Sequence, residues 1–420
     1  MDTIALNAGI LKVCWLAAYN KNARREAYPA ELQQIMSIQK AAESRSWLST
    51  WSKINNGTPL HNLPGLAKEL GVAAVKVKDE SVRSETGSFK ALGAPIALVR
   101  LILSTFPENN FDPRRLLSGD YKTELANFTV VSATDGNHGK GLAAAAQDIG
   151  CKCVIVLHAN VSIEREEAIA AYGAEIVRIT GNYDESVEHA AHIAATNNWI
   201  VVSDTSYEGY EIIPRDVMQG YGTIAAEIID ACNTGEDFTH VFLQGGVGGL
   251  AAGIVSYFWE FFGSKRPTFV VVEPEQADCL YQSALAGKAA NATGSVDSVM
   301  AGLACGETSP LAWKFLQPTV DFFMTITDDE AVASMRRLAV DNGNDIPLVS
   351  GESAVAGLSG LKRVVESSSL AADIGINAQS RVLLISTEGA TAPKVFADLV
   401  GQSAEAVAER QLVWTAENAA

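Results

Sequence analysis

Basic residues and long apolar runs are scarce in this sequence. In 420 residues, 32 lysines and arginines stand against 49 acidic residues, which gives a formal charge of −17 at pH 7. A chain this acidic, without a basic block, is a poor partner for nucleic acid or anionic membranes, and we expect neither. No run approaches the roughly 18 apolar residues of a membrane-spanning helix, since even the stretch around Leu101 contains Arg100.

Cysteine is also too sparse to build a disulfide scaffold, with six residues in the whole sequence. Cys151 and Cys153 form CxC rather than CxxC in a β-rich setting, so we expect buried thiols and no metal site. The first residues do not read as a signal peptide, because Lys12 and Lys21 interrupt the apolar stretch there. We therefore expect a soluble, cytoplasmic protein.

The sequence does contain a regular alternation of short apolar runs and amphipathic helices from residue 128 onward. This pattern predicts an α/β fold with mostly parallel sheets that helices cover on both faces. The expected strands are 128–133, 153–157, 175–179, 199–202, 241–243, 268–272 and 382–385, and the expected helices are 141–149, 164–172, 184–196, 250–261 and 277–286. Residues 103–127 are predicted to be a surface insertion and residues 287–299 a loop. In a further helix after Pro214, the stripe of Met218, Tyr221, Ala225 and Ile228 is predicted to face the core.

A glycine-rich segment, Gln244-Gly245-Gly246-Val247-Gly248-Gly249-Leu250, joins an expected strand to an expected helix. Glycines let the backbone approach an anion, and a helix N-terminus offers free N–H groups and a positive dipole end. The segment is not the GxxxxGK[ST] phosphate loop, and no acidic residue of a dinucleotide site is obvious after it. By itself it fits a phosphate site and a tightly packed turn equally well.

Two further segments carry polar groups at helix starts. The turn Thr134-Asp135-Gly136-Asn137-His138-Gly139 presents amides and polar side chains that can bind a carboxylate or a ring hydroxyl. The segment Ser88-Phe89-Lys90-Ala91-Leu92-Gly93 places a single lysine at the start of an apolar helix. Such a lysine is usually solvated, but partial desolvation makes an amine nucleophilic near neutral pH.

In order and spacing, the three segments resemble the β-family (fold type II) of pyridoxal-phosphate enzymes, which includes threonine dehydratases, threonine synthase and cysteine synthase. Within it, the sequence is most similar to diaminopropionate ammonia-lyases. The other segments that carry the resemblance are 78–81, 204–210, 218–221, 272–274 with 277–279, 300–307 and 386–389. The resemblance implies two interleaved three-layer α/β domains of the tryptophan synthase β-like fold and a homodimer. We expect a small domain, residues 92–195, inserted into a large pyridoxal-phosphate-binding domain formed by residues 1–91 and 196–420, with the cofactor between them.

The resemblance also assigns site residues. Lys90 would form the Schiff base with pyridoxal 5′-phosphate, and Asn137 would hydrogen-bond the ring hydroxyl of the cofactor. Ser386, with Thr387 as the neighbouring candidate, would face its pyridine nitrogen. The backbone amides of Gly245, Gly246, Val247, Gly248 and Gly249 would hold the phosphate. The substrate carboxylate would lie on the turn formed by Thr134, Asp135, Gly136 and Asn137.

The implied activity is α,β-elimination of 2,3-diaminopropionate to pyruvate and ammonia. Asp135 stands where the dehydratases carry serine, and a carboxylate suits a leaving ammonium group; helix capping is the alternative for it. Asp204, after its own strand, is the second candidate, because two carboxylates in different environments can divide proton removal and donation. We assign His138 a structural role.

Two positions depart from the ammonia-lyase pattern. Residues 83–87 are more polar than in that family, and Tyr207 stands where tryptophan is usual. Both are expected to border the substrate, so the substrate is the open point. The alternatives are a lyase, dehydratase or β-replacement enzyme for hydroxyaspartate, serine or threonine, or a non-catalytic binding protein on the same fold.

Overall fold

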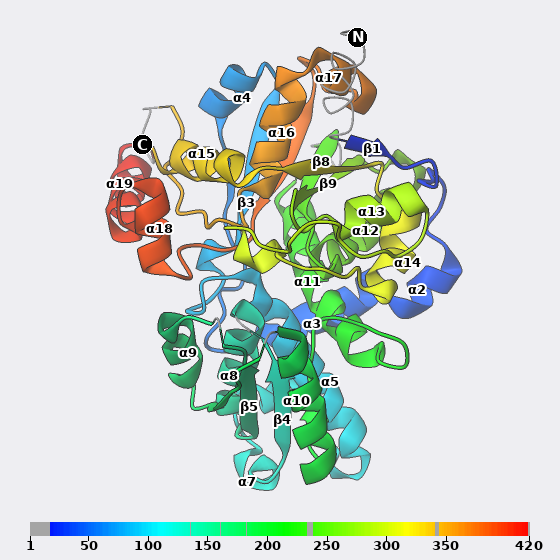
Figure 1. Cartoon of the computed structure of the whole chain (residues 1–420), viewed down its shortest axis with the longest axis vertical. Helices are drawn as coiled ribbons and strands as arrows, with labels where there is room; N and C mark the ends of the chain where they lie inside the picture. Colours follow the sequence, from blue (N-terminus) through cyan, green and yellow to red (C-terminus); the bar gives the residue numbers. More distant parts are fainter. Residues whose placement is uncertain are drawn as a thin grey trace, which may run out of the picture.

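The computed structural model of the chain describes residues 17–134, 136–159, 161–181, 183–232, 238–340 and 344–418. Its strands form two sheets, of seven and four strands. The elements of the seven-stranded sheet occupy the upper part of Figure 1, and those of the four-stranded sheet the lower part. Asp135, one of the predicted catalytic residues, lies outside the described residues.

The larger sheet has the strand order β1-β10-β9-β8-β11-β3-β2. Its five inner strands run parallel, and only the edge strands β1 and β2 pair antiparallel with their neighbours. The strands are β1 Ala17–Tyr19, β2 Leu60–Asn62, β3 Ala74–Asp79, β8 His240–Gln244, β9 Thr268–Pro274, β10 Phe322–Ile326 and β11 Arg381–Ser386. Parallel strands end at the same edge of the sheet, so the segments after β3, β8 and β11 lie near one another there.

Alternate residues of the inner strands enter two separate hydrophobic cores. On β9, Phe269 and Val271 belong to one core, whereas Val270 and Val272 belong to the other. Both faces are buried, as expected for parallel strands with continuous apolar runs. The first core continues to one face of the smaller sheet and so packs the two sheets into one molecule. It does so through four helices: α5 Gly93–Thr105, α8 Asn137–Ile149, α11 Ile212–Ala231 and α12 Gly249–Phe262.

The smaller sheet is entirely parallel, in the order β6-β5-β4-β7. Its strands are β4 Thr129–Ala133, β5 Lys152–Leu157, β6 Glu175–Arg178 and β7 Ile200–Val201. Helix α8 begins directly after β4 and helix α10 follows β6, so each strand leads through a helix to the next. All four strands come from one continuous part of the chain, between residues 129 and 201.

The helices of the structure have the following bounds: α2 Ala30–Ile35, α3 Ile38–Leu48, α4 Pro64–Leu70, α5 Gly93–Thr105, α6 Pro113–Leu116, α7 Lys122–Leu125, α8 Asn137–Ile149, α9 Ile163–Ala170, α10 Tyr183–Asn197, α11 Ile212–Ala231, α12 Gly249–Phe262, α13 Cys279–Ala286, α14 Pro310–Thr319, α15 Asp328–Ala339, α16 Ala356–Glu366, α17 Ser368–Ile374, α18 Pro393–Val400 and α19 Ala404–Asn418. Among the described residues, none of these helices is both long and apolar enough to cross a membrane.

The predicted strands and helices are all present, with ends that differ by a few residues. The core stripe on α11 is confirmed, since its four residues are buried, and Cys151 and Cys153 are buried free thiols. The prediction of a surface insertion at residues 103–127 was wrong in part, because Leu116 and Leu125 are buried in the first core. Residues 287–299 form no helix or strand, as expected.

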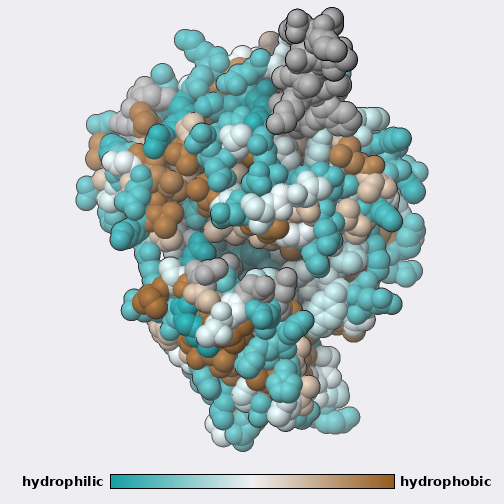
Figure 2. Space-filling view, viewed as in Figure 1, coloured by the Kyte–Doolittle hydropathy of each residue, from teal (hydrophilic) through white to brown (hydrophobic). Residues whose placement is uncertain are grey.

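Figure 2 shows one face of the molecule hollowed across its middle. The hollow lies between the part built on the seven-stranded sheet and the part built on the four-stranded sheet (Figures 1 and 2). The segments that carry the predicted site residues follow the carboxyl ends of β4, β7, β8 and β11. In α/β proteins this edge of a parallel sheet is where ligands bind.

Candidate active site

Lys90 lies on a short 3-10 helix, η3 Phe89–Leu92, that leads into α5. Its position relative to the large sheet is held by the backbone, since the amide of Phe89 donates to the carbonyl of Thr387 at 3.0 Å. Ser88 also pairs with Glu388 in an isolated antiparallel bridge. The lysine is thereby tied to the segment that follows β11.

The amino group of Lys90 donates to Oδ2 of Asp204. Asp204 follows β7 of the small sheet, so this contact joins segments from the two sheets. Burial opposes the charged form of Lys90, but the Asp204 carboxylate outweighs it and raises the pKa of the lysine above its usual value. Burial likewise opposes ionisation of Asp204, and Lys90 outweighs it, so the pKa of Asp204 lies below its usual range. The two groups therefore form a charged pair at neutral pH.

His138 lies on the other side of Asp204, with its Nδ1 3.9 Å from Oδ2 of that carboxylate. Its Nε2 is 3.0 Å from the carbonyl of Val202, an acceptor, which requires the proton to be on Nε2. Burial lowers the pKa of His138, although the charge of Asp204 opposes this. The histidine is thus neutral and hydrogen-bonded to the backbone at the end of β7, in keeping with the structural role expected for it.

The glycine-rich segment connects β8 to α12 at the same edge of the large sheet. Gly248 has φ +101°, which strongly favours glycine, and α12 begins at the next residue. The N–H groups of the first helical turn have no acceptor inside the helix and can hold an anion. A Cβ at Gly249 would lie 4.0 Å from both the carbonyl oxygen of Asp204 and the ring of Tyr221, so the segment borders the Lys90–Asp204 pair.

Gly245 differs from the other residues of this segment. Its amide donates to the carbonyl of Val272 at 2.8 Å, within the sheet. A Cβ at this position would meet the side chain of Glu273 at 2.6 Å. Packing therefore requires glycine at position 245. The backbone amides that remain available to an anion are those of the residues after Gly245, at the start of α12.

Asn137 is the first residue of α8, and its side-chain amide donates to Oε2 of Glu388. Thr134 is buried at the end of β4, where its hydroxyl accepts from the amide of Gly136 at 3.4 Å. These three residues of the predicted substrate turn therefore lie at the carboxyl edge of the small sheet. Asp135, between them, lies outside the described residues.

Ser386 and Thr387 are buried at the end of β11. The hydroxyl of Ser386 donates to the hydroxyl of Ser350 at 2.9 Å, and the carbonyl of Thr387 holds the backbone of Phe89. The serine therefore lies next to the segment that carries Lys90, and its role at the pyridine nitrogen stays a prediction. The contact with Ser350 adds a second hydroxyl that the sequence did not indicate.

Tyr207 lies in a surface turn closed by a backbone bond from Tyr210 to Tyr207. Its side chain is about half exposed and stacks on Tyr210, with ring centroids 4.9 Å apart. Tyr210 anchors the turn, because its hydroxyl donates to the carbonyl of Val201 at 2.9 Å. The structure gives Tyr207 a stacking partner three residues away rather than a contact with Lys90.

Two buried glutamates at the site were not predicted. Glu388, within the motif that ends at Gly389, bonds Asn137, and Glu352 lies close enough to couple to it electrostatically. Both side chains are less than 5% exposed. The position of Glu388 shortly after a predicted strand could have indicated that it belongs to the site. Glu352 follows no predicted element, and no pattern in the sequence distinguished it.

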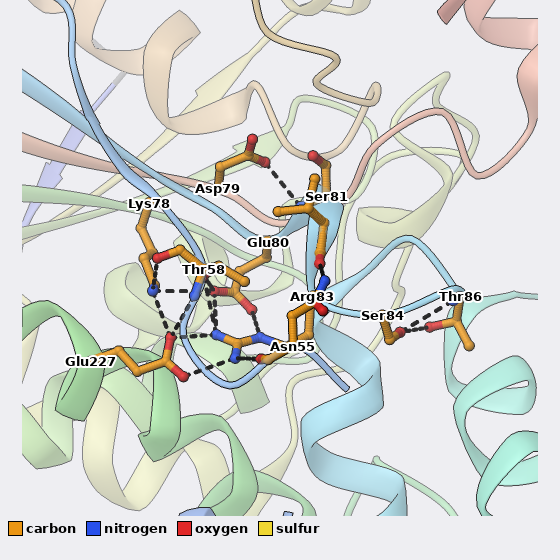
Figure 3. Close-up of polar contacts among 11 residues, drawn as sticks. Asn55, Thr58, Lys78, Asp79, Glu80, Ser81, Arg83, Ser84, Thr86 and Glu227 are labelled. Atoms are coloured by element: carbon orange, nitrogen blue, oxygen red, sulfur yellow. Dashed lines mark hydrogen bonds and ion pairs between the residues drawn. The ribbon is translucent and has the colours of Figure 1, made fainter. Parts of the chain in front are cut away.

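A buried network of charged residues supports the segment before Lys90 (Figure 3). Lys78, at the end of β3, donates to Glu227 of α11 at 2.6 Å, and Arg83 donates to Glu227 and to Glu80 at 2.6 and 2.7 Å. Two acids thus balance two bases. Burial opposes ionisation of Glu227, but Arg83 and Lys78 lower its pKa to about 2. The network joins β3 to the helix that also carries Tyr221.

The residues of this site fit pyridoxal phosphate. Free amides at a helix start suit a phosphate, a largely buried lysine amine suits the aldehyde, and the side chains of Ser386 and Asn137 offer a hydroxyl and an amide for hydrogen bonds to the ring. The pattern of the family of pyridoxal-phosphate dependent enzymes matches residues 52–388, most of the chain. The chain belongs to this family.

Comparison with individual members supports the same assignment. The chain is 36% identical over 403 residues to the diaminopropionate ammonia-lyase of Salmonella typhimurium, covering 93% of this chain and 99% of the relative. The holo diaminopropionate ammonia-lyase of Escherichia coli superimposes with a TM-score of 0.84 at 36% identity, covering 91% and 96% of the two chains. The same enzyme with an aminoacrylate-PLP azomethine reaction intermediate gives a TM-score of 0.82. The resemblance to diaminopropionate ammonia-lyases and the fold type II class are confirmed, and pyridoxal phosphate is the cofactor of this family.

Proposed function

We propose that this protein is a pyridoxal-phosphate-dependent ammonia-lyase that converts 2,3-diaminopropionate to pyruvate and ammonia. The observation that carries the proposal is the contact between Lys90 and Asp204 beside the glycine-rich start of α12. It brings a buried amine, a carboxylate and an anion site together. The similarity to ammonia-lyases over nearly the whole chain supports the choice of substrate.

In the proposed mechanism, the cofactor, when bound, withdraws electrons from the carbon skeleton of the amino acid. Lys90 would hold it covalently, Asn137 would bond its ring hydroxyl and Ser386 would face its pyridine nitrogen. A hydroxyl at that nitrogen, in place of a carboxylate, favours elimination over transamination. The amides from Gly246 to Gly249 would orient the phosphate at the positive end of α12.

Proton transfer would be carried out by the side chains around Lys90. The amino group of Lys90 is protonated beside Asp204, so the carboxylate must take a proton from Nζ before the amine can react. Once released by the α-amino group of the substrate, Lys90 can remove a proton from Cα on its side, and Asp204 is the second candidate base. We propose that the Asp135 carboxylate holds the β-ammonium of the substrate by charge attraction. The nitrogen then keeps the electron pair of the broken C–N bond and leaves as ammonia.

The domain boundaries and the oligomeric state are also part of the proposal. We propose residues 92–195 as a small domain inserted into a large domain of residues 1–91 and 196–420, because strands β4, β5 and β6 of the smaller sheet lie between residues 129 and 178. Strand β7 Ile200–Val201 pairs with β4, so the smaller sheet continues past the expected boundary at residue 195. We also propose a homodimer, as implied by the family resemblance, and a cytoplasmic location, which the sparse cysteines support. Tyr207 is proposed to border the substrate from the surface turn.

Purified protein loaded with pyridoxal phosphate tests the function. It should release a 2-oxo acid and ammonia from D- or L-diaminopropionate, faster than from serine, threonine or hydroxyaspartate. Turnover of the hydroxy amino acids with none of diaminopropionate would reject the proposed substrate. Absence of the visible-edge absorbance band of a lysine-bound cofactor would reject the catalytic role altogether.

A further inference from the structure

The contact between Glu388 and Asn137 connects the two sheets at the candidate site. Glu388 lies two residues beyond β11 of the large sheet, and Asn137 is the first residue of α8, which follows β4 of the small sheet. The Asn137 amide donates to Oε2 of Glu388, and the glutamate side chain is buried. The acceptor end of the bond is therefore shielded from water, while Asn137 is partly exposed, and burial of the acceptor strengthens a hydrogen bond to a charged group.

The bond also restricts what the Asn137 side chain can do. A side-chain amide has two N–H groups, and one of them is engaged by Glu388. The directions of the second N–H and of the carbonyl oxygen are then set, because the amide group is planar. Without Glu388, the first residue of a helix would leave this side chain free to turn among several rotamers.

The same bond sets the distance between two expected cofactor contacts. Ser386, proposed to face the pyridine nitrogen, is two residues before Glu388 on the same segment. Asn137, proposed to bond the ring hydroxyl, belongs to the other sheet. Glu388 thus connects the groups that would hold two parts of one ring.

We propose that Glu388 is a positioning residue, whose carboxylate holds the Asn137 amide so that its free N–H is directed to the ring hydroxyl of the cofactor. This inference rests on the proposed function, since it takes the role of Asn137 from it. Glu388 acts through Asn137 and needs no contact with the substrate. Its predicted effect is therefore on cofactor binding and on the electronic state of the ring.

The charges around Glu388 are arranged to keep it an acceptor. The acids, Glu388 and Glu352, come from the large-sheet side, whereas the bases, Lys140 of α8 and Arg165 of α9, come from the small-sheet side. Nη2 of Arg165 lies 4.0 Å from Oε1 of Glu352, and Lys140 interacts electrostatically with Glu388. Burial and the charge of Glu388 raise the pKa of Glu352 to about 7. Burial raises the pKa of Glu388 as well, but its hydrogen bonds with Ser353 and Asn137 and the charge of Arg165 favour its charged form. When Glu352 carries the proton of this pair, Glu388 is left as the charged acceptor.

A double-mutant cycle between Glu388 and Asn137 tests the proposal. Glu388→Met removes the acceptor at similar size, Glu388→Gln keeps a carbonyl acceptor, and Asn137→Ala removes the donor. For each variant, the dissociation constant of pyridoxal phosphate and the pH dependence of the visible absorbance band are measured, and thermal unfolding reports whether the protein is folded. The control is Glu69→Gln, which alters an exposed glutamate that pairs with Arg337 and leaves the Asn137–Glu388 bond in place.

We expect Glu388→Met to weaken cofactor binding roughly 10-fold and to shift the pH at which the band changes, because a buried hydrogen bond to a charged group is lost. Glu388→Gln, which keeps a neutral acceptor, should weaken cofactor binding less, by about threefold, and Glu69→Gln should stay within about twofold of wild type. In the Asn137→Ala background, Glu388→Met should change binding by less than about twofold, because two residues that act as one unit are not additive.

The inference would be overturned if Glu388→Met weakened cofactor binding equally in the wild-type and the Asn137→Ala proteins. It would also be overturned if Glu388→Gln weakened binding as much as Glu388→Met. If Glu388→Met does not fold, the comparison of Glu388→Gln with Glu388→Ala takes its place and is judged in the same way. Failure of the proposed function is distinguishable, because then wild-type protein itself shows no lysine-bound band. A normal wild-type band with no response to Glu388→Met would reject only the positioning role.

Discussion

Asp204 and Lys90 are 114 positions apart in the sequence, yet the carboxylate of one accepts a hydrogen bond from the amino group of the other. Each side chain is only about one-fifth exposed. Burial alone would favour the neutral form of both groups, but together they favour the charged forms. The nucleophilicity of the lysine is therefore set by a residue on the other sheet.

Replacing Asp204 by Asn should lower kcat at least ~100-fold, because a proton carrier beside the reacting centre is lost. It should also lower the pKa of Lys90, since burial then acts without an opposing charge. The rate at which apoenzyme takes up pyridoxal phosphate, measured against pH, should have its midpoint at lower pH in the variant. The control is Asp230→Asn, which alters an exposed aspartate that pairs with Arg45. An unchanged uptake profile would contradict the electrostatic role.

Replacing Lys90 by Ala should abolish the visible absorbance band and lower kcat by at least ~1,000-fold, because no other described amine lies in contact with Asp204. Absorbance spectra of the reconstituted protein check the first point and 2-oxo acid release the second. Lys314→Ala, which removes a surface lysine paired with Glu211, should retain the band. Persistence of the band in Lys90→Ala would move the covalent attachment to another residue.

Asp135→Asn should lower kcat for diaminopropionate at least ~100-fold if this carboxylate serves the leaving amino group. With serine as the substrate, whose leaving group is a hydroxyl, kcat should fall much less. The measurement is therefore the ratio of the kcat values for diaminopropionate and serine. If Asp135 only caps the helix, Asp135→Asn should leave both the stability and this ratio nearly unchanged, because asparagine caps a helix as well as aspartate does.

Arg83→Met should destabilise the fold by roughly 3–5 kcal/mol, because it leaves Glu80 and Glu227 buried beside Lys78 alone. Denaturant unfolding measures the loss. Arg24→Met, at an exposed pair with Glu26, should change the free energy of unfolding by less than about 0.5 kcal/mol. Similar losses in both variants would mean that the buried network contributes no more than a surface ion pair.

Glu352 should make the protein less stable as the pH rises. Burial and the charge of Glu388 raise its pKa from 4.5 to about 7, so the folded state binds a proton that the unfolded state releases. Stability is then lost between about pH 4.5 and 7, by up to roughly 3 kcal/mol. Glu352→Gln removes this titration, so the Tm of the variant relative to wild type should increase from pH 5 to pH 8. A constant difference would exclude the raised pKa.

The sequence predicted β8, β9 and β11 of the large sheet and the four strands of the small sheet, because buried parallel strands are short apolar runs and covering helices are amphipathic. It did not predict the inner strands β3 and β10 or the edge strands β1 and β2, the last two of which have three residues each and leave no periodic signal. It also treated residues 103–127 as a surface segment. The prolines and charged residues of this segment are typical of a surface loop, so the burial of its leucines, which complete the first core, was not predicted.

The sequence by itself determined the family, the cofactor chemistry and the residues that are candidates for it, because those depend on local motifs such as Ser88–Gly93 and the glycine-rich segment. The tertiary structure decided which side chains meet: Asp204 with Lys90, and Glu388 with Asn137. Such pairs join residues more than 100 positions apart, from two sheets. Their contact depends on how helices α5, α8 and α11 pack the sheets together, and no local pattern encodes that.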